Sequence, residues 1–148
     1  MSESTRILVV DDDESIRKSL TAVLELKGYL VDVAENGEEA IKKSNANYYK
    51  LALIDIHLPD MEGTELLNAI KETTPKMVKL ILTGYPTLQN ATKASNKGAD
   101  GYILKPVNMD HLLDMIAERL KKQQEEKEYS QEKIEEYIET RAKELGLL

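Results

Sequence analysis

The sequence predicts an α/β protein with an open, doubly wound parallel sheet, and three observations support this fold class. Short apolar runs alternate along the chain with segments whose apolar residues recur every three or four positions. Five such pairs follow one another before Lys121, which favours a parallel sheet with helices on both faces. Three of the runs are apolar almost throughout, as in strands buried on both sides. The site of such a sheet lies at the carboxyl ends of its strands.

The apolar runs define five expected strands, over residues 6–10, 29–34, 50–55, 77–83 and 101–104. The first expected helix ends at Gly28, a residue type typical of helix ends. Asn36 and Glu39 have the spacing of an N-terminal cap for a second helix, which reaches about Ala46. Further helices are expected around Leu66, Leu67 and Ile70, over residues 87–97, and from about Asn108.

The expected helix over residues 87–97 has a thin apolar face. Leu88, Ala91 and Ala94 are expected to point inward. A small contact area makes an element easy to shift. Close packing of a helix rich in small residues is equally compatible with this composition.

The composition changes at Lys121. Residues 121–148 hold six Lys/Arg and eight Asp/Glu, so half of this segment is charged. An apolar stripe then returns with helical spacing, at Ile134, Tyr137, Ile138, Ala142 and Leu145. We therefore expect a domain over residues 1–121 and, over residues 122–148, a charged helical extension or linker that cannot bury itself in the core. A linker, a dimerising helix, the start of a longer segment and a solvated tail all remain open.

Composition and charge exclude several classes of protein. The net charge of −7 argues against nucleic-acid binding and against docking on an anionic membrane. No apolar run is long enough to span a bilayer, and the amino terminus does not resemble a secretory signal. The absence of cysteine excludes disulfides, zinc thiolate sites and a cysteine nucleophile. A cytoplasmic location is the expectation.

Acidic residues collect at the ends of the expected strands. Asp11 and Asp12 follow the first strand, and Asp55 ends the third. Two unit charges about 4 Å apart repel by about 4 kcal/mol at an effective dielectric constant of about 20, so such a cluster favours a bound cation. Oxygen ligands without nearby His or Cys side chains favour Mg²⁺ or Mn²⁺. The neighbouring Asp13 and Glu14 are expected to cap the following helix instead.

Two further polar side chains are expected at the same edge of the sheet. Thr83 ends the fourth strand and can donate a hydrogen bond, while Lys105 follows the fifth and carries a mobile positive charge. A carboxylate can attack a phosphoryl group and form an aspartyl-phosphate. In-line phosphoryl transfer needs a metal and further cations or donors around the phosphoryl oxygens. The sequence supplies each of these groups.

Four segments carry a resemblance to a known family. They read Ile-Leu-Val-Val-Asp-Asp-Asp at residues 7–13, Ala-Leu-Ile-Asp-Ile-His-Leu-Pro-Asp-Met-Glu-Gly at 52–63, Leu-Thr-Gly-Tyr at 82–85 and Gly-Ala-Asp-Gly-Tyr-Ile-Leu-Lys-Pro at 98–106. Together they resemble the receiver domain of two-component response regulators, including the chemotaxis regulators, over roughly residues 5–120. The resemblance implies a flavodoxin-like sheet of order 2-1-3-4-5. It also implies a signalling switch, rather than an enzyme, that takes a phosphoryl group from a sensor histidine kinase.

The resemblance assigns roles to residues of this sequence. Asp55 would be the phosphoacceptor, and Asp11, Asp12, Asp55 and the backbone carbonyl of His57 would hold Mg²⁺. Thr83 and Lys105 would bind the phosphoryl oxygens, and the Lys105–Pro106 bond would be cis.

The resemblance also implies how the signal leaves the domain. Tyr102 would be the switch aromatic that turns inward as Thr83 moves, although an ordinary half-buried strand residue is an alternative. The partner, or an output domain, would dock on the face formed by the 87–97 helix, the 101–104 strand and the last helix. Phosphorylation-dependent dimerisation is a further expectation. His57 and Tyr85 each lie two residues after a site residue and leave the lifetime of the phosphorylated state open.

Three other functions remain open from the sequence. A Mg²⁺-dependent phosphatase of the haloacid dehalogenase type also uses a strand-end aspartate, and Asp11 and Asp13 form an Asp-x-Asp pattern. A flavin carrier needs a hydroxyl-rich loop after the first strand, where this chain has four acids. A pseudo-receiver that only binds partners is the third, and the complete set of acids, Thr and Lys argues against it.

Overall fold

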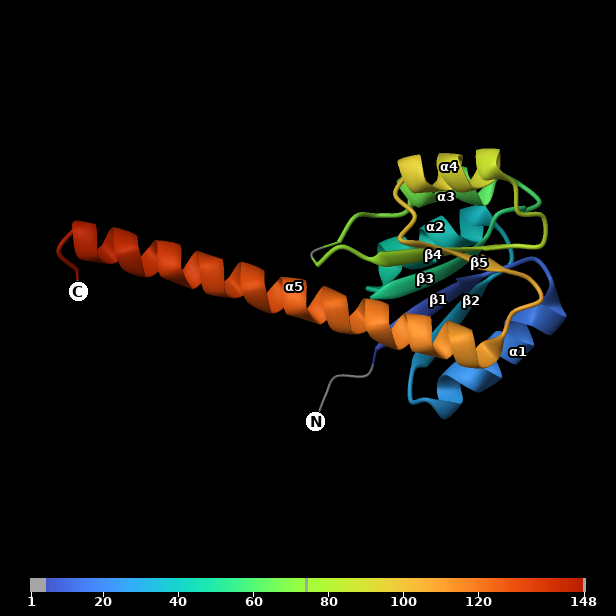
Figure 1. Cartoon of the computed structure of the whole chain (residues 1–148), viewed down its shortest axis with the longest axis horizontal. Helices are drawn as coiled ribbons and strands as arrows, with labels where there is room; N and C mark the ends of the chain where they lie inside the picture. Colours follow the sequence, from blue (N-terminus) through green and yellow to red (C-terminus); the bar gives the residue numbers. More distant parts are fainter. Residues whose placement is uncertain (1–4, 74, 148) are drawn as a thin grey trace.

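The computed structural model describes residues 5–73 and 75–147 and has the predicted parallel α/β fold. The strands are β1 (Arg6–Val10), β2 (Leu30–Ala34), β3 (Leu51–Asp55), β4 (Val78–Thr83) and β5 (Gly101–Leu104). They form one parallel sheet in the order β2-β1-β3-β4-β5, the flavodoxin-like order (Figure 1). The helices are α1 (Glu14–Leu26), α2 (Gly37–Ala46), α3 (Gly63–Ala69), α4 (Leu88–Asn96) and α5 (Met109–Glu144).

The helices cover both faces of the sheet. α1 and α5 pack on one face, and α2, α3 and α4 pack on the other (Figure 1). Side chains of a strand point alternately to the two faces, so in β1 Ile7 and Val9 join the core under α1 and α5, whereas Leu8 and Val10 join the other core. Because β1, β3 and β4 lie inside the sheet, both of their faces are buried, which explains their nearly continuous apolar sequences.

Polar side chains fix the starts of the helices as the sequence predicts. The Asp13 carboxylate accepts hydrogen bonds from the backbone N–H groups of Ser15 and Ile16, and so caps α1. Asn36 caps α2 through the N–H of Glu39. At the other end of α1, Gly28 has a φ of +90°, a conformation that L side chains rarely adopt.

The register of the strands brings the site together. Val10 pairs with Ile54, so Asp11 and Asp55 follow side by side at the carboxyl ends of β1 and β3. Thr83, at the end of β4, pairs with Leu104 of β5, and Lys105 comes next. Residues distant in sequence therefore arrive at one edge of the sheet.

The inward face of α4 differs from the expectation. Ala94 is buried, but Leu88 is 85% exposed, so its predicted inward orientation was wrong. The reason is geometric: Leu88 lies about 120° around the helix from Ala94, at roughly 100° per residue. With Ala94 on the core, Leu88 faces solvent.

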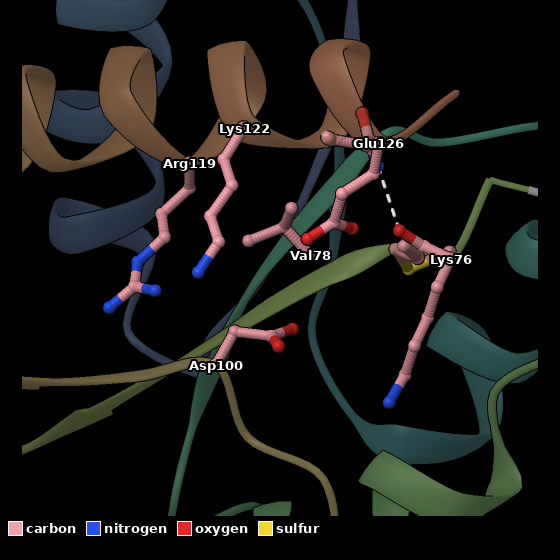
Figure 2. A pocket seen from close by; sticks show the side chains of 8 residues that line it. Lys76, Val78, Asp100, Arg119, Lys122 and Glu126 are labelled. Carbon is pink, nitrogen blue, oxygen red and sulfur yellow. Dashed lines mark hydrogen bonds between the residues drawn. The ribbon is translucent and has the colours of Figure 1, made fainter. Parts of the chain in front are cut away.

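α5 is one continuous helix that passes the domain and runs away from it (Figure 1). Gln123, which falls in the segment expected not to bury itself, is only 6% exposed, so that expectation was wrong at this position. Its Nε2 donates to the backbone carbonyls of Lys50, at 3.0 Å, and Lys76, at 2.8 Å; the second bond is dashed in Figure 2. The division into residues 1–121 and 122–148 remains a prediction, and residues 1–4, 74 and 148 lie outside the described part of the chain.

Among the described residues, the structure contains no helix with the length and apolar character needed to cross a membrane.

Candidate functional site

Three carboxylates gather at the carboxyl edge of the sheet. Asp11 and Asp55 are buried and Asp12 is exposed, and one carboxylate oxygen of each lies within 4.8 Å of the others. Asp11 is held by its neighbours, because its Oδ1 accepts from the N–H of Asp13 at 2.9 Å and its own N–H donates to the carbonyl of Ala34. The structure thus brings together the three acids that the sequence predicts as metal ligands.

Lys105 reaches into this cluster from the end of β5. Its Nζ lies 2.9 Å from Asp11 Oδ2 and 3.0 Å from Asp55 Oδ2. Burial would lower the pKa of the Lys105 ammonium, but the hydrogen bonds and charges of both carboxylates outweigh burial and raise it. Lys105 is therefore a cation shared by two acids.

Burial raises the pKa of the Asp55 carboxyl above its usual value. The N–H of His57, 3.1 Å from Asp55 Oδ1, and the bond from Lys105 act in the opposite direction, and the nearby charge of Asp11 adds to the rise. Two donors therefore stabilise the carboxylate form in a site whose burial disfavours charge.

The loop after β3 is held tightly against Asp55. The N–H of Gly63 donates to the carbonyl of Ile56 at 2.7 Å, and a Cβ on Gly63 would lie 2.2 Å from the Asp55 carbonyl oxygen. Farther along this loop, the Asp60 carboxylate accepts from the N–H groups of Gly37, at 2.8 Å, and Glu38, at 2.9 Å, at the start of α2. These two hydrogen bonds lower the pKa of Asp60. The first bond thus closes the two ends of the loop on each other, and Asp60 fixes the middle of the loop to α2.

Thr83 and Tyr102 lie on the neighbouring strands. Thr83 is fully buried, and its Oγ1 accepts from the N–H of Tyr85 at 3.1 Å. The exposed Tyr85 ring meets the His57 ring edge-on, with the ring centroids 6.4 Å apart. Tyr102 is half-buried against the core under α2, α3 and α4, and its hydroxyl is buried without a hydrogen-bond partner among the described residues. The Lys105–Pro106 bond is cis, as expected.

The donor set fits Mg²⁺. Carboxylate oxygens are the ligands that this hard ion prefers, and the group Asp11, Asp12 and Asp55 could hold one. The exposed Asp12 leaves the cluster open to solvent on one side, so an ion held there would keep room for further oxygen ligands.

A separate pocket of about 100 Å³ lies at the opposite, amino-terminal edge of the sheet (Figure 2). Positive and negative side chains line it together: Lys76, Arg119 and Lys122 with Asp100 and Glu126. It lacks the convergent carboxylates of the other edge, so the chemistry described above belongs to the carboxyl edge.

The sequence reasoning missed one residue beside the acidic cluster. Arg17 of α1 donates from Nη1 to the backbone carbonyl of Asp11 at 2.9 Å. A basic residue in the helix that directly follows the acidic loop is a signal for such a contact, but helical spacing alone does not show which atom it reaches.

Comparison with known proteins assigns the class. Residues 7–117 match the family model described as the response regulator receiver domain. The chain therefore belongs to the family of response regulator receiver domains, which are phosphoacceptor signalling modules. Receiver domains of response regulators take phosphoryl groups from histidine kinases and link to output domains.

Individual relatives support the same class. One similar solved structure is the crystal structure of a CheY-like response regulator receiver domain protein from Methanospirillum hungatei JF-1. Its sequence is 46% identical to this one, and the two structures superpose with a TM-score of 0.80 over 84% of this chain and 99% of that chain. The transcriptional regulatory protein ZraR of Klebsiella oxytoca is 39% identical over 80% of this chain and 27% of its own length. A cyclic di-GMP phosphodiesterase of Thermotoga maritima is 37% identical over 78% of this chain and 31% of its own length. The chain thus spans about a third or less of these two longer proteins.

Proposed function

We propose that Asp55 accepts a phosphoryl group from the phosphohistidine of a sensor histidine kinase, in a Mg²⁺-dependent reaction that switches the surface of this domain. The observation that carries the proposal is the convergence of Asp11, Asp12, Asp55 and Lys105 at one edge of the sheet. Mn²⁺ has the same ligand preference and is expected to replace Mg²⁺.

Asp55 acts as the nucleophile in this proposal. One of its carboxylate oxygens attacks the phosphorus while the bond from phosphorus to the imidazole nitrogen breaks, and the electron pair of that bond returns to the imidazole of the kinase. The Lys105 and His57 N–H contacts favour the carboxylate form that makes the attack, and so oppose the effect of burial.

Asp11, Asp12 and Asp55, with the backbone carbonyl of His57, would hold the metal. Bound Mg²⁺ supplies positive charge that offsets the negative charge of the phosphoryl oxygens. Lys105 supplies a second positive charge, since its Nζ already reaches two of the carboxylates and can turn to a phosphoryl oxygen.

Thr83 and Tyr102 are the proposed switch. The Thr83 hydroxyl accepts from Tyr85 N–H and keeps its own hydrogen available for a phosphoryl oxygen. The Tyr102 hydroxyl is buried with no hydrogen-bond partner among the described residues, which is costly. Its strand β5 pairs with β4, which ends at Thr83, so we expect a shift of Thr83 to move this ring. The face of α4, β5 and α5 would then change its affinity for a partner protein, an output domain or a second copy of the chain.

We propose that the switch controls an output domain or a partner protein of a kind that varies among relatives. Relatives named as transcriptional regulators and as a cyclic di-GMP phosphodiesterase share the domain, so different outputs follow similar receivers. The charged segment over residues 122–148 would serve as the connector, and no nucleic acid or membrane is expected to bind this acidic chain directly.

Intact mass spectrometry after incubation with acetyl phosphate tests the acceptor and the metal together. We expect one added phosphoryl group on the wild-type protein with Mg²⁺, none without Mg²⁺ and none on Asp55→Asn. Asp60→Asn is the matched control, because Asp60 is an exposed acid of the same loop outside the cluster, and it is expected to gain the group.

An adduct on Asp55→Asn, or an adduct formed equally well without Mg²⁺, would contradict the proposal. Release of many phosphates per protein from a generic phosphate monoester would support the phosphatase alternative. A wild-type protein that gains no phosphoryl group would favour the pseudo-receiver.

A further inference from the structure

Arg17 is a mostly buried cation next to the acidic cluster. Its side chain, from the start of α1, is only 12% exposed. Nη1 donates to the backbone carbonyl of Asp11 at 2.9 Å, while Nη2 lies 3.6 Å from Oε1 of Glu35. The bond to Asp11 has the length of a charge-assisted hydrogen bond, and such bonds are stronger than neutral ones.

The carbonyl that Arg17 binds belongs to the peptide group between Asp11 and Asp12. A peptide group is planar, so fixing its carbonyl oxygen also fixes the direction of its N–H and of the Asp12 Cα. The Asp11 side of this peptide is already held by the bonds to Asp13 and Lys105. Arg17 holds the side that leads to Asp12.

Asp12 needs this support more than its two neighbours. Asp11 and Asp55 are buried and hydrogen-bonded, whereas the exposed Asp12 carboxylate has neither a hydrogen bond nor an ion pair within the described residues. Nothing that contacts the Asp12 carboxylate itself therefore fixes it in place. Its position follows from its backbone, which is held on one side by the bond of Asp13 N–H to Asp11 Oδ1 and at the intervening carbonyl by Arg17.

We infer that Arg17 is a positioning residue of the metal site. It holds the peptide between Asp11 and Asp12 so that the Asp12 carboxylate lies beside those of Asp11 and Asp55 before the ion binds. The inference rests on the proposed function, which makes this cluster a Mg²⁺ site. Residues that orient the ligands of a metal typically change its affinity about 10- to 100-fold when they are removed.

The contact with Glu35 is the minor one. Glu35 is 67% exposed and 3.6 Å away, and an exposed ion pair contributes little to stability. The variant Glu35→Gln removes the negative charge of this contact and leaves the bond to Asp11, so it separates the ion pair of Arg17 from its bond to the backbone.

The test is a Mg²⁺ titration of Arg17→Gln, Arg17→Lys and the wild type, followed by amide chemical shifts without any phosphodonor. The same proteins are then phosphorylated with acetyl phosphate at increasing Mg²⁺. Lys18→Gln is the matched control, since Lys18 is the next residue of α1 and is 76% exposed. Hydrogen exchange of the Asp12 and Asp13 amides in the metal-free proteins reports on the peptide itself.

For Arg17→Gln we expect Mg²⁺ binding weakened by at least about tenfold, with the phosphorylation rate restored at saturating Mg²⁺. Arg17→Lys should lie between this variant and the wild type, because an ammonium can still donate to the Asp11 carbonyl. Lys18→Gln and Glu35→Gln should match the wild type. Faster exchange at Asp12 or Asp13 in Arg17→Gln is expected before any metal is added.

Equal Mg²⁺ affinity in Arg17→Gln and Lys18→Gln would overturn the inference while leaving the proposed function intact. A lower plateau rate with an unchanged half-saturating Mg²⁺ concentration would also overturn it. If Arg17→Gln does not fold, the Arg17→Lys titration and its amide exchange decide the question. If the wild type gains no phosphoryl group but Arg17→Gln still weakens Mg²⁺ binding, the proposed function fails and the positioning role stands.

Discussion

Lys79 is a buried basic residue near the amino end of β4. Its Nζ donates to the carbonyl of Leu67 in the last turn of α3 at 2.7 Å. Burial lowers the pKa of its ammonium. A cation at the carboxyl end of a helix also interacts favourably with the helix dipole. Lys79 therefore joins α3 to the sheet through an amino group whose charged form is disfavoured by burial.

The stability of the protein should depend on pH through Lys79. In the unfolded chain Lys79 has the ordinary lysine pKa of 10.5, and in the folded protein its pKa is lower. At a pH between these two pKa values, the unfolded chain therefore binds more protons than the folded protein. The free energy of unfolding then rises with pH. Urea unfolding from about pH 8 to about pH 10 should show the wild type gaining stability relative to Lys79→Met.

Lys71→Met serves as the control for this experiment, because Lys71 is exposed. The difference in free energy of unfolding between Lys71→Met and the wild type should stay constant over the same pH range. If the difference in free energy of unfolding between Lys79→Met and the wild type also stays constant, the proposed link between Lys79 and pH is contradicted.

The residues of the site could be predicted from sequence because each follows an apolar strand. Asp11, Asp55, Thr83 and Lys105 need only the parallel topology to meet at one edge. The bond from Arg17 to a backbone oxygen could not be predicted, because it depends on the path of one turn and on one side-chain rotamer. The same holds for Lys79, which interrupts an apolar strand and gives no sign of the carbonyl that it reaches.

At the scale of elements, the loop from β3 to α3 depends on Gly63. A side chain there would collide with the carbonyl of Asp55, the last residue of β3. We expect Gly63→Ala to lower the free energy of unfolding by about 1–3 kcal/mol, as overpacking usually does. Chemical denaturation measures this change.

Gly84→Ala is the comparison for Gly63→Ala, since a Cβ on Gly84 would meet only Lys105 Cβ, at 4.0 Å. It should cost clearly less stability than Gly63→Ala. Equal losses in the two variants would show that the close approach at Gly63 is not the cause.

The elements could be predicted unequally well. β1, β3 and β4 follow directly from apolar runs, because strands buried on both faces leave little room for polar residues. The orientation of α4 could not be predicted correctly, because Ala91 and Ala94 are small and Leu88 dominates the apolar pattern without touching the core. In so short a helix, packing against the sheet decides the buried face.

At the scale of the whole molecule, Gln123 is the last buried residue of α5 within the described part of the chain. Both hydrogens of its amide are used, one for the carbonyl before β3 and one for the carbonyl near the start of β4. Gln123→Ala should lower the free energy of unfolding by about 1–2 kcal/mol, because two hydrogen bonds to backbone carbonyls are lost. It should also speed hydrogen exchange in the residues of α5 around position 123.

The neighbouring Gln124→Ala offers a control, since Gln124 is exposed and, among the described residues, its side chain hydrogen-bonds only to Glu128 of the same helix. It should leave stability and exchange almost unchanged. If the two variants behave alike, Gln123 does not anchor the helix.

Helical character beyond Lys121 could be predicted from the spacing of its apolar residues, but the anchoring of the helix could not. A glutamine in a highly charged segment resembles any other solvated residue, and its two carbonyl partners come from turns far away in sequence. Only the folded sheet brings those turns under the helix.

The anchor gives α5 the geometry of a lever with its pivot at the domain. Glu144 lies about 30 Å beyond Gln123 at a rise of roughly 1.5 Å per residue. A tilt of about 10° at the pivot would move the far end by about 5 Å, an amplification that needs no change within the helix itself. The carbonyls that hold the pivot adjoin the amino ends of β3 and β4, the two strands whose other ends carry Asp55 and Thr83. If sliding of either strand tilted the helix by that angle, the far end of α5 would move by about 5 Å, roughly the spacing between neighbouring strands.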